Sequence, residues 1–91
     1  MGLFGFGKKK KTLEDLSKEF GVKLGAPNPS EDYAAFQVKG VKSSANDATE
    51  QLFKNAKSQS VLYLFDISAP TEKRSAMATN YIVTAVGYIK K

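Results

Sequence analysis

The chain contains no cysteine, no histidine and no tryptophan. Without cysteine it can form neither disulfides nor the usual structural zinc sites. Without histidine it lacks the most common general base and transition-metal ligand, which excludes Ser-His-Asp and Cys-His catalysis. The adjacent carboxylates at residues 14–15 and 31–32 do not face each other on a helix, and we interpret them as helix-start charges. We therefore expect a non-catalytic protein, and we assign no catalytic residue, metal ligand or cofactor.

Long apolar runs are also missing. No run approaches the roughly 20 residues that a transmembrane helix needs. At the N-terminus the lysines follow the apolar residues instead of preceding them, which is unlike a signal peptide. The lack of cysteine agrees with a reducing compartment. The sequence therefore predicts a cytoplasmic protein, with membrane association through its first residues as an open alternative.

The 91 residues suffice for one domain, and 42% hydrophobic and 25% charged residues are ordinary globular values. Residues 1–11, MGLFGFGKKKK, differ in composition from the rest of the chain and contain three glycines, which oppose a helix. We interpret residues 1–11 as a flexible basic tail and residues 12–91 as a single small domain.

This tail combines apolar and basic side chains, which suits an anionic surface. Apolar side chains can insert at the boundary of lipid headgroups while lysines contact anionic lipid. The same lysines could contact nucleic-acid phosphates without reading sequence, or the tail could be solvated and bind nothing specific. The candidate residues for an anionic surface are Leu3, Phe4, Phe6, Lys8, Lys9, Lys10 and Lys11.

Two segments carry helix signals. Thr12 is a potential N-cap with Asp15 completing a capping box, and Gly21 can end the helix over residues 12–20. A second helix is predicted over residues 44–57. Its apolar stripe consists of Ala45, Ala48, Leu52, Phe53 and Ala56.

Three segments carry strand signals. Residues 33–41 alternate between apolar and polar side chains. Residues 61–67 are almost continuously apolar, which predicts a central strand covered on both faces. Residues 81–89 are rich in β-branched and aromatic side chains and favour a strand over the end of a long helix. The polar connection over residues 69–80 has room for one helical turn.

These elements predict an α+β fold: a short N-terminal helix, then β-α-β-β with a three-stranded mixed sheet covered by one helix. The helical crossover makes residues 33–41 and 61–67 parallel, and the last strand returns antiparallel to the central one. The first helix then packs beside the second or on the other face. Because residues 33–41 or 81–89 would leave a free edge, we expect a homo-oligomer formed through strand edges.

Aromatic residues on the strands offer two interpretations. Tyr33, Phe36, Tyr63 and Phe65 could form an RNA-stacking surface, or they could belong to the core. The core interpretation is favoured because only Lys39 supplies positive charge on these strands. A second, smaller basic point, Lys73 and Arg74, lies in the exposed 69–80 connection.

The run DATEQLFKNAKSQSVLYLFDIS at residues 47–68 and the run YIVTAVGYIKK at residues 81–91 resemble the end of the YbjQ family. These are small bacterial cytoplasmic proteins described as heavy-metal-binding domains. The match is most direct at residues 83–87, VTAVG. The resemblance implies a β-α-β-β core and self-assembly into rings. The family's glycine-rich middle segment is missing here, the first helix has no counterpart there, and this chain lacks His and Cys for metal binding.

The net charge of +5 comes from the two ends of the chain. Residues 8–11 and 90–91 hold six of the fourteen basic residues, which leaves eight basic against nine acidic residues in between. We therefore expect a non-catalytic, self-associating binding and assembly module whose tail contacts anionic surfaces. The alternatives are a nucleic-acid-binding protein that uses the lysine tail, which is not favoured, and a small-ligand or cation binder of the YbjQ type.

Overall fold

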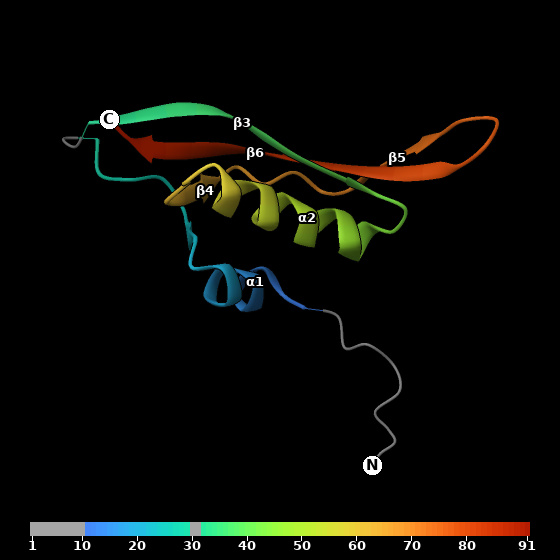
Figure 1. Ribbon diagram of the computed structural model, residues 1–91, viewed down its shortest axis with the longest axis horizontal. Helices are drawn as coiled ribbons and strands as arrows, with labels where there is room; N and C mark the ends of the chain where they lie inside the picture. The colour runs from blue at the N-terminus through green and yellow to red at the C-terminus, as the bar shows by residue number, and fades with distance from the viewer. Residues whose placement is uncertain (1–10, 30–31) are drawn as a thin grey trace, which may run out of the picture.

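The structure is a computed structural model that describes residues 11–29 and 32–91 of the chain (Figure 1). The described part has the α+β fold that the sequence predicts. Of the tail residues singled out above, only Lys11 belongs to it, and the others lie outside the described residues. The elements are α1 (Leu13–Phe20), β2 (Lys23–Leu24), β3 (Tyr33–Lys42), α2 (Ala45–Ser58), β4 (Tyr63–Phe65), β5 (Thr71–Arg74) and β6 (Thr79–Lys90).

The strands form one mixed sheet in the order β2-β4-β6-β3, with β5 also paired to β6. β6 is antiparallel to β3, β4 and β5, whereas β2 and β4 are parallel. Residues 33–41 and 61–67 therefore contribute strands that run in the same direction, but β6 lies between them. The prediction that residues 61–67 form the central strand is wrong, because β6 pairs with β3 along one side and with β4 and β5 along the other. For the same reason residues 81–89 do not form a sheet edge.

The sheet has five strands where the sequence predicts three. β2 is only two residues long, which is too short to show an alternation. β5 forms a hairpin with the start of β6 inside the 69–80 connection, so no helical turn forms there. Ser75 closes this hairpin, since its N–H donates to Ala78 O and its Oγ accepts from Ala78 N. Every residue of β5 is exposed, which explains why no apolar pattern marks it.

α1 begins and ends as its sequence predicts. The Thr12 Oγ1 accepts from Asp15 N, and the Asp15 carboxylate accepts from Thr12 N, both at 3.1 Å. Gly21 ends the helix in the left-handed region at φ 69°. Leu16 is buried, and Phe20 contacts Phe53 of α2 with ring centroids 6.5 Å apart. α1 therefore packs against α2, on the same side of the sheet (Figure 1).

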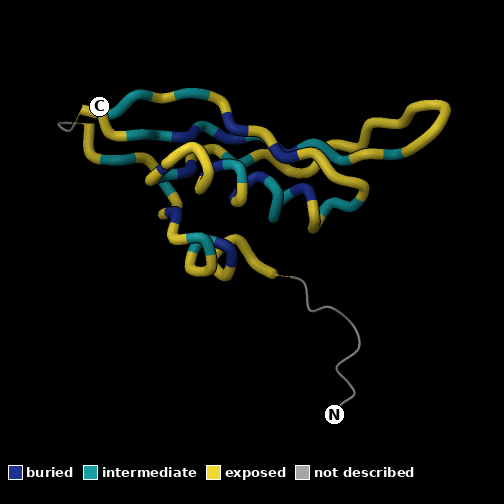
Figure 2. The backbone as a smooth tube through the Cα atoms, viewed as in Figure 1, coloured by how far each residue is buried: buried dark blue, intermediate teal, exposed yellow. Residues whose placement is uncertain are grey.

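α2 supplies the centre of the core. Ser44 caps it, since its Oγ accepts from Asp47 N at 3.2 Å. One stripe of the helix is fully buried, and Figure 2 shows buried stretches where α2 faces the sheet. The buried stripe consists of Ala48, Leu52, Phe53 and Ala56. From the sheet, Val38, Leu64, Val83 and Ala85 meet it in the same core.

Candidate functional site

Gly40 identifies the side of the sheet that packs against α2. A Cβ added to Gly40 would lie 2.2 Å from the carbonyl O of Ala48, in the backbone of α2. Because side chains alternate across a strand, the even-numbered residues of β3 face the helix and the odd-numbered ones face away. Paired residues share a side, so the pairing of Gly40 with Val83 and of Lys39 with Thr84 extends this assignment to β6.

We call the side that faces away from both helices the open face. None of its residues is buried, whereas the helix side of β6 contains the buried residues Val83, Ala85 and Gly87. Among the described elements, both helices lie on the other side of the sheet (Figure 1). Register assigns to the open face Lys23, Tyr33, Ala35, Gln37, Lys39, Val41, Tyr63, Phe65, Thr71, Lys73, Asn80, Ile82, Thr84, Val86, Tyr88 and Lys90.

Four aromatic side chains gather on the open face where β6 ends. Tyr63 pairs with Tyr88, and Phe65 pairs with Val86. The Tyr33 ring meets the Tyr63 ring edge to face, with centroids 5.7 Å apart and planes at 88°. Phe65 is 46% exposed, and the three tyrosines are half-buried. We call Tyr33, Tyr63, Phe65 and Tyr88 the aromatic patch.

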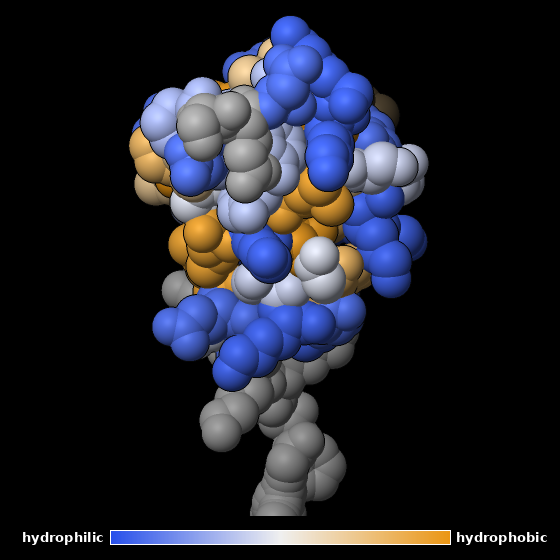
Figure 3. All heavy atoms as spheres, turned by 90° about the vertical axis from the view of Figure 1, so that its left-hand side faces the viewer, coloured by the Kyte–Doolittle hydropathy of each residue, from blue (hydrophilic) through white to orange (hydrophobic). Residues whose placement is uncertain are grey.

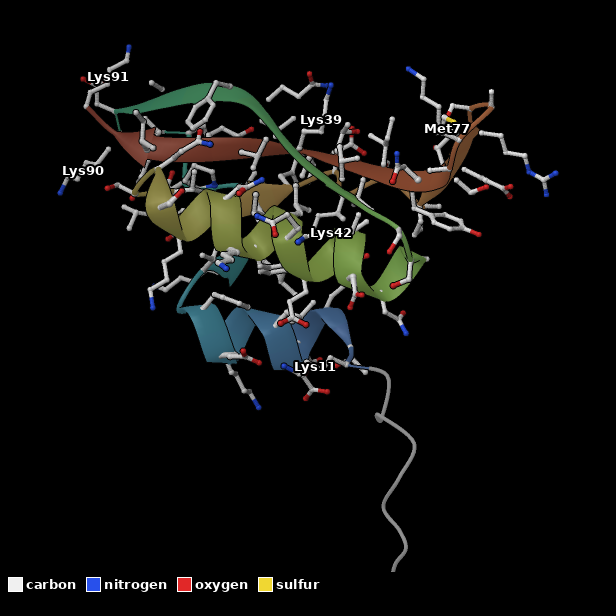
Figure 4. All side chains as sticks on the ribbon, turned by 45° about the vertical axis from the view of Figure 1, so that its right-hand side comes forward. Lys11, Lys39, Lys42, Met77, Lys90 and Lys91 are labelled. Atoms are coloured by element: carbon white, nitrogen blue, oxygen red, sulfur yellow. The ribbon has the colours of Figure 1, made fainter. Side chains whose placement is uncertain are left out.

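Lysines flank the aromatic patch. The Nζ of Lys23 lies 5.7 Å from the centre of the Tyr63 ring, which is within cation–π distance. Lys90 pairs with Tyr33, and Lys39 pairs with Thr84 in the middle of β6. Figure 4 shows Lys39 on the side of the sheet away from α2, whereas Lys42 lies toward the helix. The patch thus combines exposed aromatic surface with ammonium groups on the same face.

Backbone hydrogen bonds fix the short strands that carry this patch. Leu62 N donates to Tyr88 O at 2.9 Å, and Lys23 N donates to Leu62 O at 2.9 Å. After β4, Ser68 ties the chain to β6, because its N donates to Thr84 O at 2.8 Å and its Oγ accepts from Thr84 N at 3.0 Å. The patch therefore stands on a hydrogen-bonded sheet and not on a loop.

The structure separates the two residues of the predicted second basic point. Lys73 pairs with Asn80 on the open face, whereas Arg74 pairs with Thr79 and faces the other side. The Arg74 guanidinium donates to the Glu72 carboxylate. Of these two residues, Lys73 alone therefore adds positive charge to the open face.

The favoured interpretation of the strand aromatics as core residues is wrong for most of them. Phe36 packs against the core, as predicted, but Tyr33, Tyr63 and Phe65 lie on the open face. Sequence reasoning also missed Tyr88 and Lys23. Tyr88 lies an odd number of residues from the helix-facing residues of β6, and this spacing could have placed it on the open face. No such signal exists for Lys23, because β2 is too short to show an alternation.

The end of the molecule where β2 and β4 lie is partly apolar at its surface. Figure 3 views this end and shows apolar side chains between hydrophilic regions. Leu24 of β2 and Leu62 just before β4 are 38% and 41% exposed. In the part of the chain that the structure describes, no helix is long and apolar enough to cross a membrane.

The side chains of the open face are suited to binding a ligand. Aromatic faces can stack on nucleobases and ammonium groups can pair with phosphates. Within residues 11–29 and 32–91 there is no group of three or more acidic side chains that could hold a metal ion.

Comparison of the chain with models of protein families, with curated proteins and with solved structures finds no match.

Proposed function

We propose that the chain is a non-catalytic binding module that binds single-stranded nucleic acid across the open face of its sheet. The observation that carries the proposal is the aromatic patch with Lys23 and Lys90 beside it and Lys39 further along the same face. Base stacking on aromatic side chains contributes about 1–3 kcal/mol per base and tolerates any sequence. The lysines supply the salt-dependent attraction to phosphates.

Charge argues against a second copy of the chain on the same face. A two-fold contact would bring the lysines of one open face against those of the other, and like charges at an interface cost several kcal/mol. A lipid surface suits the patch less well than a nucleic acid, because the three tyrosines are half-buried in the sheet. Half-exposed rings are better placed to stack on bases than to insert between headgroups.

The test compares two anionic polymers of equal length, oligo-dT and an abasic strand with the same phosphates. We expect the full chain to bind oligo-dT more tightly, measured by fluorescence anisotropy, because only that strand offers bases for stacking. Phe65→Ala should reduce this difference, because it removes one of the stacking partners. Changing Lys8, Lys9 and Lys10 to Gln should weaken binding to both strands equally. Equal affinity for the two strands, or binding to anionic vesicles alone, would contradict the proposal.

A second candidate function is assembly through the outer edge of β3. The backbone of Thr84 bonds to Ser68 on the side away from β3, so the N–H and C=O of its partner Lys39 point outward. Asn55 Nδ2 donates to the outward Lys39 O at 2.7 Å, and by alternation Gln37 presents its own N–H and C=O outward. An edge of ten residues with outward backbone groups favours strand pairing with another copy.

Gln37→Pro tests this assembly. Proline removes an outward N–H without breaking a bond to β6, and edge positions tolerate it. Sedimentation should show an oligomer for the parent chain and a monomer for this variant, while Gln37→Thr should behave like the parent. A parent chain that is a monomer at every protein concentration tested would contradict assembly through the edge of β3.

The other predictions from the sequence stay predictions. They are a cytoplasmic location, contact of the tail with an anionic membrane, and the YbjQ resemblance with a small ligand or cation. A thermal-shift series with divalent cations tests the last of these.

A further inference from the structure

A groove of about 1240 Å³ lies where α1, the start of α2 and the segment after β4 meet. This volume exceeds the roughly 300–1,000 Å³ of typical small-molecule pockets, so the groove suits a peptide segment better. Leu13 lines it and is 40% exposed, although it belongs to the apolar side of α1. The other apolar residues of its lining are Leu16, Ala45, Ile67, Ala69 and Pro70.

The charged lining of the groove is mainly acidic. Its carboxylates are Asp15, Glu19, Asp47 and Glu50. Lys11 is the basic residue among the described lining, and its Nζ lies 2.7 Å from Glu19 and 4.0 Å from Glu50. The hydrogen bond to Glu19 raises the pKa of Lys11 above its ordinary value. A lysine at this position is thus stabilised in its charged form.

The segment that leads into Lys11 matches the groove in chemistry. Residues 1–10 contain three lysines, at positions 8–10, and the apolar residues Met1, Leu3, Phe4 and Phe6. Phe6 is five residues from Lys11, a reach of up to about 17 Å for an extended chain. We propose that the groove binds the chain's own N-terminal segment, with its lysines against the acidic lining and its aromatic residues against the apolar lining.

The groove and a nucleic acid bound at the open face would compete for the lysines at positions 8–10. If nucleic acid is the ligand of the open face, which rests on the function proposed above, it must draw the N-terminal segment away from the groove. A free phosphate-bearing ligand would not enter the groove itself, because the carboxylates repel it.

The absence of tryptophan gives a direct test, because Phe4→Trp makes a chain with one tryptophan. In the full chain without nucleic acid we expect blue-shifted emission and weaker quenching by acrylamide than in a peptide of residues 1–11 with the same change. The signal should not depend on protein concentration, since the contact is within one chain. Emission like that of the free peptide would overturn the proposal, and so would protection that grows with concentration.

Charge reversal provides the matched variants. Glu50→Lys changes a groove carboxylate, and Glu14→Lys makes the same change on the part of α1 that does not line the groove. In the Phe4→Trp background we expect the first to restore exposed emission and the second to leave it blue-shifted. Equal effects of both would show that only net charge matters and would contradict a groove contact. Because no nucleic acid is present, these outcomes are independent of the function of the open face.

Discussion

The two faces of the sheet differ in what their side chains do, although residues of the two faces alternate along the same strands. On β3, Val38 and Gly40 are buried against α2, while Gln37 and Lys39 between and beside them are exposed. On β6, Val83, Ala85 and Gly87 are buried, while Val86 and Tyr88 are only half-buried. The side chains on the helix side pack in the core and stabilise the fold. The open face keeps aromatic and basic side chains that the core does not use, and these are the side chains that we propose bind the ligand.

The largest effect on this contrast should come from Phe53→Ala on the helix side. Phe53 is fully buried, and truncation of a buried phenylalanine costs about 3–5 kcal/mol. That is a large share of the stability of a domain this size, roughly 5–14 kcal/mol. Chemical denaturation should show this loss. Phe65→Ala, on the open face, serves as its control and should cost less than half as much, and equal losses would contradict the division between the faces.

Gly40→Ala tests how closely α2 approaches the sheet. The added Cβ would meet the backbone of Ala48 and Leu52, which cannot move as a flexible side chain does. Overpacking of this kind costs about 1–3 kcal/mol. Thermal unfolding should therefore occur at a lower temperature than in the parent. The neighbouring change Lys39→Ala should leave the midpoint almost unchanged, and a comparable drop there would show that the open face also bears on stability.

Phe65→Ala should separate binding from stability. Loss of one stacking partner should weaken binding of oligo-dT by about 1–3 kcal/mol, or roughly 5- to 150-fold. Anisotropy titration measures this change. Leu62→Ala is the matched control, because Leu62 is similarly exposed but precedes β4 and is not part of the aromatic patch. A similar loss of affinity in both variants would mean that the patch has no special role.

The smallest effect is expected for Lys39→Gln. Removal of one phosphate contact should reduce the slope of log affinity against log salt by about 0.7 for a single strand. The decrease in affinity should be the same for oligo-dT and the abasic strand, since Lys39 recognises phosphate and not base. Lys42→Gln, on the helix side of the same strand, should leave the slope unchanged. An unchanged slope for Lys39→Gln would remove this lysine from the binding surface.

The helices could be predicted from sequence because their signals are local. The capping box of Thr12 and Asp15, the stop at Gly21 and the apolar stripe of α2 depend on neighbours within a few residues. The strand at residues 81–89 was also predicted correctly, and Gly87 within it has a packing reason. A Cβ there would lie 2.5 Å from a methyl group of Val38, so the small residue makes room for the core.

The order of the strands and the open face could not be predicted, for a physical reason. An apolar run such as residues 61–67 indicates that both sides of a strand are apolar, but it does not say whether a helix covers both. Here Leu64 enters the core while Phe65 remains 46% exposed. A strand with one uncovered face normally alternates between apolar and polar residues. Here exposed aromatic residues stand where polar residues would, so the alternation is lost. The basic residues that accompany them come from other strands, so only the folded chain brings them together.

The most direct test of the central claim is an NMR titration of the full chain with oligo-dT. The account predicts that the signals of Tyr33, Tyr63, Phe65 and Tyr88 shift with added strand. The signals of Leu52 and Phe53, on the other side of the sheet, should stay in place. Shifts confined to the N-terminal residues, or an open face that does not respond at all, would contradict it.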